Sequence, residues 1–324
     1  MSGVISRTPA AGREHLSGYQ ARDYDIVDYR MYELPGTRLW FRGPMPDLEA
    51  GRYFTCIGAA QTFGCFCSQP FPDLLAQKLG LPSLNLGYGG AGPEFFARQP
   101  GLLDYVNRGR FLILQMMSGR SQSNALFDSG GLEYLVRRRD GTPRGANQAY
   151  QELLEGPRAL RSFGRVGRVL ARMVATPRAR RVAEETRQAW IESHRKLLEQ
   201  VRVPVVLLWF SKRVPAYTLH TRNLRGYFAD FPQLIDEPTL AAVKPLCDAY
   251  VACVSSRGMP QPLVSRFTGQ PTSIDPARDR PDLAGSARWT HNHYYPSPEM
   301  HEDAAAALLA ACRRLVQATP DAIA

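Results

Sequence analysis

Short apolar runs alternate along this chain with stretches of helical spacing, and the alternation strongly constrains the fold. The pattern predicts strands at residues 53–57, 83–86, 111–117, 205–210 and 251–254, and helices at residues 71–79, 183–201, 240–250 and 302–316. Parallel strands need long crossover connections, and helices supply them. The sequence therefore predicts an α/β protein, a three-layer α/β/α sandwich with a mostly parallel sheet.

The chain length of 324 residues fits either two domains or one α/β domain with insertions. We expect an N-terminal extension over residues 1–50 and one α/β domain over residues 51–318. A basic helical insertion is expected within that domain, at about residues 130–182.

Three features indicate a cytoplasmic protein. The longest apolar runs, residues 205–210 and 304–312, are far shorter than the ~18 residues that cross a membrane. Residues 1–19 lack the apolar stretch of a secretory signal. The six cysteines lie in a chain too long to depend on disulfides, so we expect reduced thiols.

The net charge of +10 is concentrated in residues 156–202, which hold twelve Lys and Arg against four Asp and Glu. Spacings of three and four place five arginines on one helical stripe: Arg158, Arg161, Arg165, Arg168 and Arg172. Such a basic amphipathic helix binds an anionic membrane surface, or it is simply a solvated face. Gly164 and Gly167 weaken the helix and favour the solvated face. Nucleic acid is not expected as a partner, because Phe163 alone supplies an interleaved aromatic.

Small and polar residues follow three of the predicted strands. They read GAAQTFG at residues 58–64, NLGYGGAG at 85–92 and SGRSQSN at 118–124, and a fourth block, NHYYPSPEMH at 292–301, precedes the predicted last helix. Ligand sites of open α/β sheets lie at the carboxyl ends of the strands. We therefore expect the four segments to converge on one crevice.

The first segment resembles the leading motif of the SGNH/GDSL hydrolases, Gly-Asp-Ser-x-Thr-x-Gly. Gly58, Thr62 and Gly64 match this motif in register. The resemblance extends over about residues 50–130 and 200–318. It implies the three-layer, flavodoxin-like sheet of that family.

The second and third blocks of the family have weaker counterparts. The resemblance places the oxyanion-hole glycine at Gly89 or Gly90. In the third block, Gly-x-Asn-Asp, Gly119 fits, Ser121 stands at the Asn position and Asn124 is the nearest asparagine.

The resemblance also implies that the catalytic triad is substituted. Ala60 stands at the serine position, and aligning the last block places Asn292 at the aspartate and Tyr295 at the histidine. A two-residue shift would restore His293 as a base but leaves the serine missing. A methyl group cannot attack a carbonyl, so a conventional Ser-His-Asp hydrolase is not predicted.

A second, narrower likeness covers most of the chain. Residues 39–44, 70–74 and 295–301 resemble an uncharacterised bacterial family of SGNH-like proteins, some of which occur near surface-polysaccharide genes. The likeness implies a bacterial origin and a glycan setting. It implies no activity.

Four other side chains could act as nucleophiles or could have structural roles. Cys65 and Cys67 lie just beyond the first block, where a helix N-terminus would lower the pKa of a thiol, although buried cysteines are common. Ser121 and Ser123 follow the third strand, where serines usually hydrogen-bond the loop backbone. We favour the structural role for all four.

Histidine is the commonest metal ligand, and His291, His293 and His301 lie close together in the sequence. No further carboxylate or thiol is placed beside them by spacing, so structural or surface roles are favoured. We predict no metal and no cofactor. Which of the three faces the crevice is left open.

Two function classes follow. The first is a degenerate SGNH-like protein that binds an acyl or sugar group in the former active site, as in bacterial surface-polysaccharide metabolism. The alternative is an esterase or an acyl or glycoconjugate transferase that uses Cys65 or His293. The ligand is a small molecule or glycan, and the substrate-binding candidates are Gly58, Gln61, Thr62, Gly89, Gly90, Gly119, Arg120 and Asn124. Arg120 either grips an anion or pairs with an acid on the rim.

Overall fold

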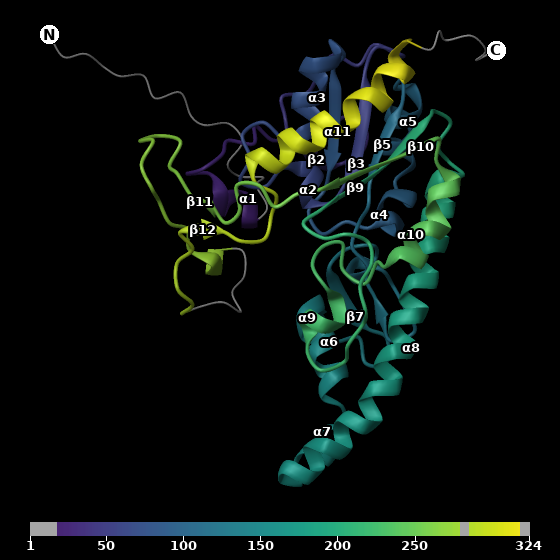
Figure 1. Ribbon diagram of the computed structural model, residues 1–324, viewed down its shortest axis with the longest axis vertical. Helices are drawn as coiled ribbons and strands as arrows, with labels where there is room; N and C mark the ends of the chain where they lie inside the picture. Colours follow the sequence, from purple (N-terminus) through teal and green to yellow (C-terminus); the bar gives the residue numbers. More distant parts are fainter. Residues whose placement is uncertain (1–17, 279–284, 318–324) are drawn as a thin grey trace, which may run out of the picture.

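The computed structural model describes residues 18–278 and 285–317. Its centre is a five-stranded sheet in the order β10-β9-β5-β3-β4, in which all neighbouring strands are parallel (Figure 1). The strands are β3 (Phe54–Gly58), β4 (Ser83–Gly87), β5 (Leu112–Gln115), β9 (Val205–Ser211) and β10 (Ala249–Val254). This flavodoxin-like order confirms the predicted parallel sheet.

The central strands form where the sequence is continuously apolar. Every residue of β5 and β9 is buried, as expected for strands covered on both faces. Val205 and Val206 in β9 also favour the extended backbone because they are β-branched.

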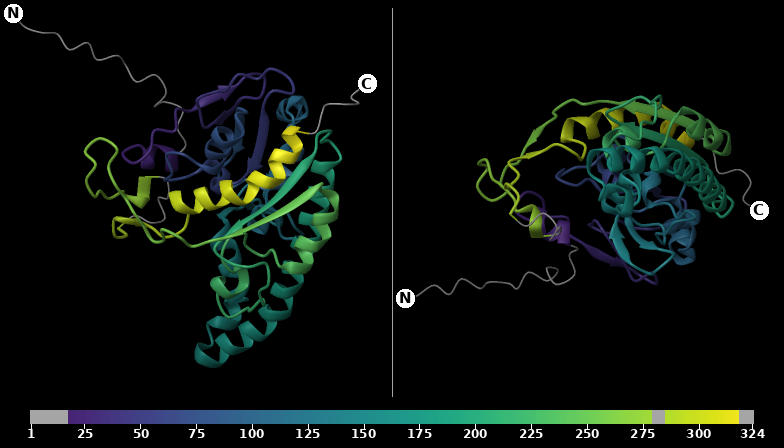
Figure 2. Two further views of the ribbon diagram at one scale, coloured as in Figure 1. Left: turned by 45° about the horizontal axis from the view of Figure 1, so that its top comes forward. Right: turned by 90° about the horizontal axis from the view of Figure 1, so that it is seen from below.

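Helices cover both faces of the sheet and complete the predicted three layers (Figure 2). One layer contains α3 (Phe71–Leu79) and α11 (Pro298–Gln317). The other contains α4 (Pro93–Ala97), α5 (Pro100–Arg108), α10 (Glu237–Val243) and the C-terminal half of α8 (Gly164–Leu198). Trp190 of α8 and Leu102 of α5 are fully buried on this second face.

The basic insertion contains strands as well as helices. It is built from β6 (Phe127–Asp128), β7 (Tyr134–Arg137), β8 (Pro143–Gly145), α6 (Ala146–Glu155), α7 (Arg158–Arg161) and the N-terminal half of α8. Together α7 and this half of α8 form an arm that projects from the body (Figure 1).

The helix predicted at residues 183–201 begins earlier than expected, at Gly164, and continues through Pro177. Ala171, Ala175 and Ala179 are buried on the side that faces the rest of the insertion. Small residues one turn apart let neighbouring helices approach closely. We attribute the longer helix to this packing, which outweighs the unfavourable propensities of proline and glycine.

The helix predicted at residues 240–250 is wrong in its second half. Helix α10 ends at Val243, a 3₁₀ turn follows at Lys244–Leu246, and β10 begins at Ala249. Pro245 has no N–H to donate within a helix, and the chain extends at Cys247.

Residues 18–50 pack against the same body. They contain α1 (Gly18–Asp23) and the antiparallel pair β1 (Tyr32–Leu34) and β2 (Leu39–Phe41). Leu34 and Phe41 belong to the core beneath α5. The remaining elements are α2 (Ala60–Phe63), η2 (Gly119–Ser121), α9 (Leu224–Phe228), β11 (Gln261–Pro262), η4 (Pro276–Arg278) and β12 (His291–Asn292).

Across the described residues, no helix combines the length and the apolar character needed to cross a bilayer. Cytoplasmic residence stays a prediction.

Candidate functional site

From β3 the chain continues to β4 on one side and then crosses to β5 on the other side, so a ligand site is expected between the ends of β3 and β5. The side chain of a glutamine fills this place. Gln115, at the end of β5, accepts hydrogen bonds through Oε1 from Ala59 N and Thr62 Oγ1, both at 3.1 Å. A Cβ atom on Gly58 would lie 2.9 Å from Cβ of Gln115, so glycine is required there. Sequence reasoning missed this role, although Gln115 is the one polar residue in the apolar run at 111–117.

The first two segments meet as predicted. Asn85 Nδ2 donates to the carbonyl of Thr62 at 3.0 Å, and Asn85 Oδ1 accepts from the N–H of Gly87. A Cβ on Gly87 would lie 2.6 Å from Cα of Phe63, so the backbone of α2 rests directly on the end of β4. Gly90 adopts the left-handed region at φ 74° and faces Glu133.

The first and fourth segments also meet. Ala60 is 7% exposed, and it belongs to one hydrophobic cluster with Phe66, against which Tyr295 packs with ring centroids 5.7 Å apart. Asn292 Oδ1 accepts from the N–H groups of Tyr294 and Tyr295 at 3.0 and 2.9 Å. Ala60, Asn292 and Tyr295, which the resemblance aligns with the catalytic triad, therefore form a packed structure. They supply a methyl group, an amide used for backbone contacts and a phenol whose pKa burial raises well above its usual value.

A buried ion pair from the N-terminal region packs against this cluster. Arg22 Nε and Asp23 Oδ1 are 2.6 Å apart, and both side chains are almost fully buried. Tyr29 donates its hydroxyl to Asp23 Oδ2 at 3.0 Å and accepts from the N–H of Phe66 at 3.0 Å. We call Arg22, Asp23 and Tyr29 the N-terminal plug. It fills space beside Ala60 and Tyr295, and nothing in the sequence pattern indicated it.

The thiol candidates are placed unfavourably for catalysis. Cys65 and Cys67 are fully buried, and burial raises the pKa of Cys67 to about 12. Helix α2 ends at Phe63 with Gly64 as its left-handed cap, so Cys65 follows the C-terminus of that helix. The expected lowering of a thiol pKa by a helix N-terminus is therefore wrong.

Four polar side chains gather at the edge of the sheet. Arg120 forms two hydrogen bonds with Glu133, at 3.2 and 2.5 Å, and a longer one of 3.5 Å with Tyr294 Oη. Gln233 Nε2 donates to the same Tyr294 Oη at 2.9 Å, while its buried Oε1 has no hydrogen-bond partner among the described residues. We call Arg120, Glu133, Gln233 and Tyr294 the rim cluster. Sequence reasoning found Arg120 but missed Glu133 and Gln233.

The charge of Arg120 is compensated within the rim cluster. Burial disfavours its charge, but the adjacent Glu133 carboxylate more than offsets this and raises the pKa of Arg120 above its ordinary value. Of the two roles weighed for Arg120, the structure shows the pairing with an acid.

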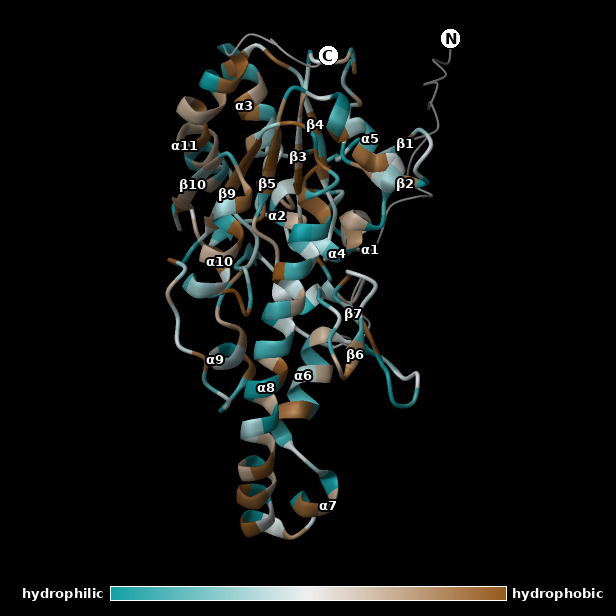
Figure 3. Cartoon of the chain, turned by 90° about the vertical axis from the view of Figure 1, so that its right-hand side faces the viewer, coloured by the Kyte–Doolittle hydropathy of each residue, from teal (hydrophilic) through white to brown (hydrophobic). Residues whose placement is uncertain are grey.

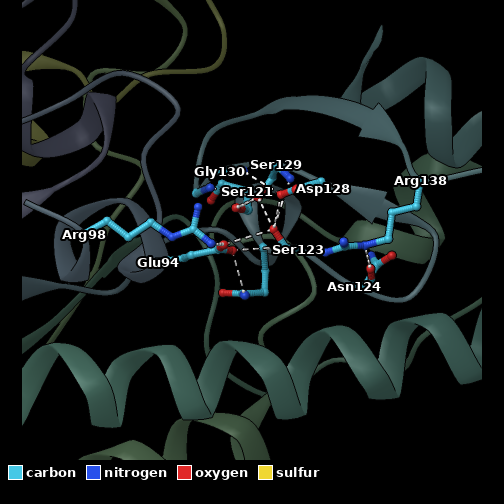
Figure 4. A network of polar contacts seen from close by, with 11 residues as sticks. Glu94, Arg98, Ser121, Ser123, Asn124, Asp128, Ser129, Gly130 and Arg138 are labelled. Atoms are coloured by element: carbon cyan, nitrogen blue, oxygen red, sulfur yellow. Dashed lines mark hydrogen bonds and ion pairs between the residues drawn. The ribbon is translucent and has the colours of Figure 1, made fainter. Parts of the chain in front are cut away.

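Ser121 and Ser123 support the loop after β5. Ser123 Oγ contacts Glu94 Oε1 at 3.1 Å and Asp128 Oδ1 at 3.2 Å, and Arg98 pairs with Glu94 at 2.6 Å (Figure 4). Ser121 Oγ donates to the carbonyl of Ser118. These contacts fit the structural role that was favoured.

The other candidates of the third segment divide between two places. The N–H of Gly119 donates to the carbonyl of Gln233 at 2.8 Å, which places it beside the rim cluster. Asn124 Nδ2 donates to Tyr150 Oη and Thr186 Oγ1 at 3.0 and 3.1 Å. Its side chain therefore belongs to the core between α6 and α8.

The three histidines do not form one site. His301 is buried and its Nδ1 accepts from the N–H of Phe71 at 3.1 Å, and burial lowers the pKa of His301 to about 3. His291 and His293 are exposed, with ring centroids 6.2 Å apart, and the His293 carbonyl accepts from Lys212 Nζ. Among residues 18–278 and 285–317, no three His, Cys, Asp or Glu side chains are grouped to hold a metal ion.

A cavity of about 590 Å³ lies in the basic insertion, away from the sheet edge. Its arginines are Arg137, Arg139, Arg144, Arg158, Arg161 and Arg178, and its apolar wall includes Phe127 and Leu153.

The arginines that were predicted to form a single stripe lie on two helices. Arg158 and Arg161 lie on α7, whereas Arg165, Arg168 and Arg172 lie on α8. Gly164, at φ 69°, turns the chain between these helices.

Three solved structures are weakly similar to this chain. A protein from Lactobacillus plantarum covers 82% of this chain and 98% of its own at 11% identity, with a TM-score of 0.36. LAE5, an alpha/beta hydrolase enzyme from the metagenome of Lake Arreo, covers 82% and 97% at 14% identity, with a TM-score of 0.36. A candidate SGNH hydrolase from Slackia heliotrinireducens covers 80% and 98% at 14% identity, with a TM-score of 0.32.

The comparison with curated proteins gives no match. One family model, described as a domain of unknown function (DUF6473), matches residues 18–130 and 161–316. The match includes the N-terminal plug, the parallel sheet and the rim residues Arg120, Gln233 and Tyr294. The chain therefore belongs to the DUF6473 family.

Proposed function

We propose that this protein is a non-hydrolytic, SGNH-like protein that binds a sugar group at the rim cluster. The observation that carries the proposal is the packed arrangement of Ala60, Asn292 and Tyr295, sealed by the N-terminal plug. A Ser-His-Asp mechanism needs a serine hydroxyl, an imidazole base and a carboxylate, and Ala60, Tyr295 and Asn292 supply none of these groups.

The rim cluster favours a sugar over an acyl group. A sugar is recognised by planar polar side chains that hydrogen-bond its hydroxyls and by an aromatic face beside them. Gln233 Nε2 and Arg120 Nη2 hydrogen-bond the hydroxyl of Tyr294, a residue that is 41% exposed, so the rim presents polar side chains beside a partly exposed tyrosine. An acyl chain would need an apolar pocket, whereas the space beside Ala60 is occupied by Tyr295 and by Tyr29 of the plug.

A catalytic role for Cys65 or His293 receives less support. Cys65 is fully buried, and a nucleophile must reach its substrate. His293 is exposed and lies on the loop beside the rim cluster, but no described contact joins it to a serine or cysteine. A place in bacterial surface-polysaccharide metabolism accords with sugar binding and is part of the proposal.

The proposal is tested by substitution of the exposed rim tyrosine. Saturation-transfer NMR with glucose, galactose, N-acetylglucosamine and glucuronic acid should detect binding of at least one sugar to the wild-type protein. We expect Tyr294→Ala to weaken that binding about tenfold, since losing one anchoring contact costs roughly 1–2 kcal/mol.

Tyr134→Ala is the matched control, because Tyr134 is 62% exposed on β7 in the insertion. It should bind sugar like the wild type. If Tyr294→Ala binds sugar as well as the wild type does, the sugar does not bind at the rim cluster. Binding of hexanoate but of no sugar would favour the acyl ligand instead.

A further inference from the structure

The arm carries an exposed apolar stripe that the body of the protein does not cover. Six side chains are between 47% and 73% exposed: Phe163, Val166, Val169, Leu170, Met173 and Val174. Their hydrophobic colour marks the distal turns of α8 in Figure 3. Single exposed apolar residues are ordinary, but a contiguous group of this kind marks an interaction surface.

The stripe has the geometry of a helix that lies at an interface. Five of the six lie on α8, where at about 100° per residue they span an arc of ~140°, and Phe163 directly precedes this helix. Gly167, Ala171 and Ala175 are buried on a different face. Arg165, Arg168 and Arg172 project between these faces, along one border of the stripe. The outermost face of the arm is therefore apolar with a cationic border.

The arm is also uniformly basic. Residues 156–183 contain eight arginines and no acidic residue. Arg161 pairs with Glu155 of α6. Within residues 18–278 and 285–317, no ion pair is found for the three border arginines or for Arg158 and Arg178, which line the 590 Å³ cavity at the base of the arm. Most of this positive charge is thus uncompensated within the described structure.

These charges decide which partner fits the stripe. Pairing the stripes of two copies would bring two sets of eight arginines together, and this repulsion opposes a dimer. A nucleic acid would leave the apolar stripe without a partner, and the stripe offers only Phe163 for base stacking. An anionic bilayer satisfies both features, because its acyl region accepts apolar side chains and its phosphates accept the arginines.

We propose that the α7–α8 arm docks this protein on an anionic lipid surface. The apolar stripe enters the boundary between headgroups and acyl chains. Arg165, Arg168 and Arg172 contact lipid phosphates, and Arg158 and Arg178 add positive charge at the base of the arm. This docking is independent of sugar binding at the rim cluster.

Vesicle co-sedimentation of the full chain tests the proposal. We expect binding to vesicles of phosphatidylcholine with 30% phosphatidylglycerol and at least tenfold weaker binding to pure phosphatidylcholine. Binding to the acidic vesicles should fall as NaCl rises from 50 to 500 mM, because salt screens the arginines. No binding, or equal binding to both vesicles, would overturn the proposal.

Two variants separate the apolar and cationic contributions. Val166→Asp/Met173→Asp alters side chains that are 71% and 67% exposed, so the variant should keep the fold. We expect this variant to bind acidic vesicles at least tenfold more weakly than the wild type. Arg165→Glu/Arg168→Glu should do the same. Wild-type binding by either variant, with an unchanged circular dichroism spectrum, would contradict the proposal.

The matched control is Arg313→Glu/Arg314→Glu, which reverses two exposed charges on α11, far from the arm (Figure 1). It should bind within about threefold of the wild type. If it weakens binding as much as the arm variants, net charge rather than the arm is responsible. A dimer in sedimentation velocity that Val166→Asp/Met173→Asp abolishes would assign the stripe to a second copy. Displacement of the vesicles by a 20-base-pair duplex at equal phosphate concentration would assign it to nucleic acid.

Discussion

Asp23→Ala should lower the free energy of unfolding by about 3–5 kcal/mol, because it leaves the Arg22 charge buried without its carboxylate. The wild-type carboxylate receives Arg22 Nε at 2.6 Å, Arg22 Nη2 at 3.2 Å and the Tyr29 hydroxyl at 3.0 Å. Urea denaturation followed by tryptophan fluorescence measures the change. The same substitution should loosen the cover over Cys65, so this thiol should react faster with Ellman's reagent.

Asp28→Ala is the matched control for the plug. Asp28 is 42% exposed and lies 3.8 Å from Arg266, and an exposed pair of this kind contributes about 1 kcal/mol or less. If Asp23→Ala and Asp28→Ala have equal and small effects, the N-terminal plug does not stabilise the region beside Ala60 and Tyr295.

Gly87→Ala should destabilise the protein by about 3 kcal/mol or more, through the close approach of α2 to the end of β4. The added Cβ would meet backbone atoms of Phe63, and a backbone cannot rotate away as a flexible side chain can. Thermal unfolding followed by circular dichroism measures the loss.

Gly145→Ala provides the comparison for this glycine. Gly145 has φ −64°, and no atom beyond its chain neighbours lies within 4 Å of an added Cβ. Its substitution should therefore change the stability by less than about 1 kcal/mol. A similarly small effect of Gly87→Ala would show that α2 does not rest on β4 as described.

The sheet could be predicted because its signals are local. Continuous apolar runs such as β9 are typical of strands buried on both faces, and helix α3 is flanked by Pro70 and Gly80, which mark its start and stop. The start of α8 could not be predicted from propensity. Its glycines and Pro177 oppose a helix locally, and only the packing of Ala171 and its neighbours on α6 and α7 shows why the helix persists.

Only the part of the site that has a local sequence signal could be predicted. The glycine-rich segments after β3 and β4 are recognisable in the sequence because close backbone approach requires glycine there. The plug and the rim cluster join residues that are far apart in the chain, such as Asp23 with Tyr29 and Phe66, or Arg120 with Tyr294. Contacts of this kind leave no periodic signal, so Glu133 and Gln233 could not be identified without coordinates.

We propose that the positions of Ala60, Asn292 and Tyr295 do not support ester hydrolysis. Labelling of the purified protein with a fluorophosphonate probe, with p-nitrophenyl acetate turnover measured in parallel, tests it most directly. An authentic serine hydrolase serves as the positive control. We predict no labelling and turnover at the background rate. If the probe labels a serine in the wild-type protein and this labelling disappears in His293→Ala, the account is contradicted. Such a result would show a working nucleophile and base at this edge of the sheet.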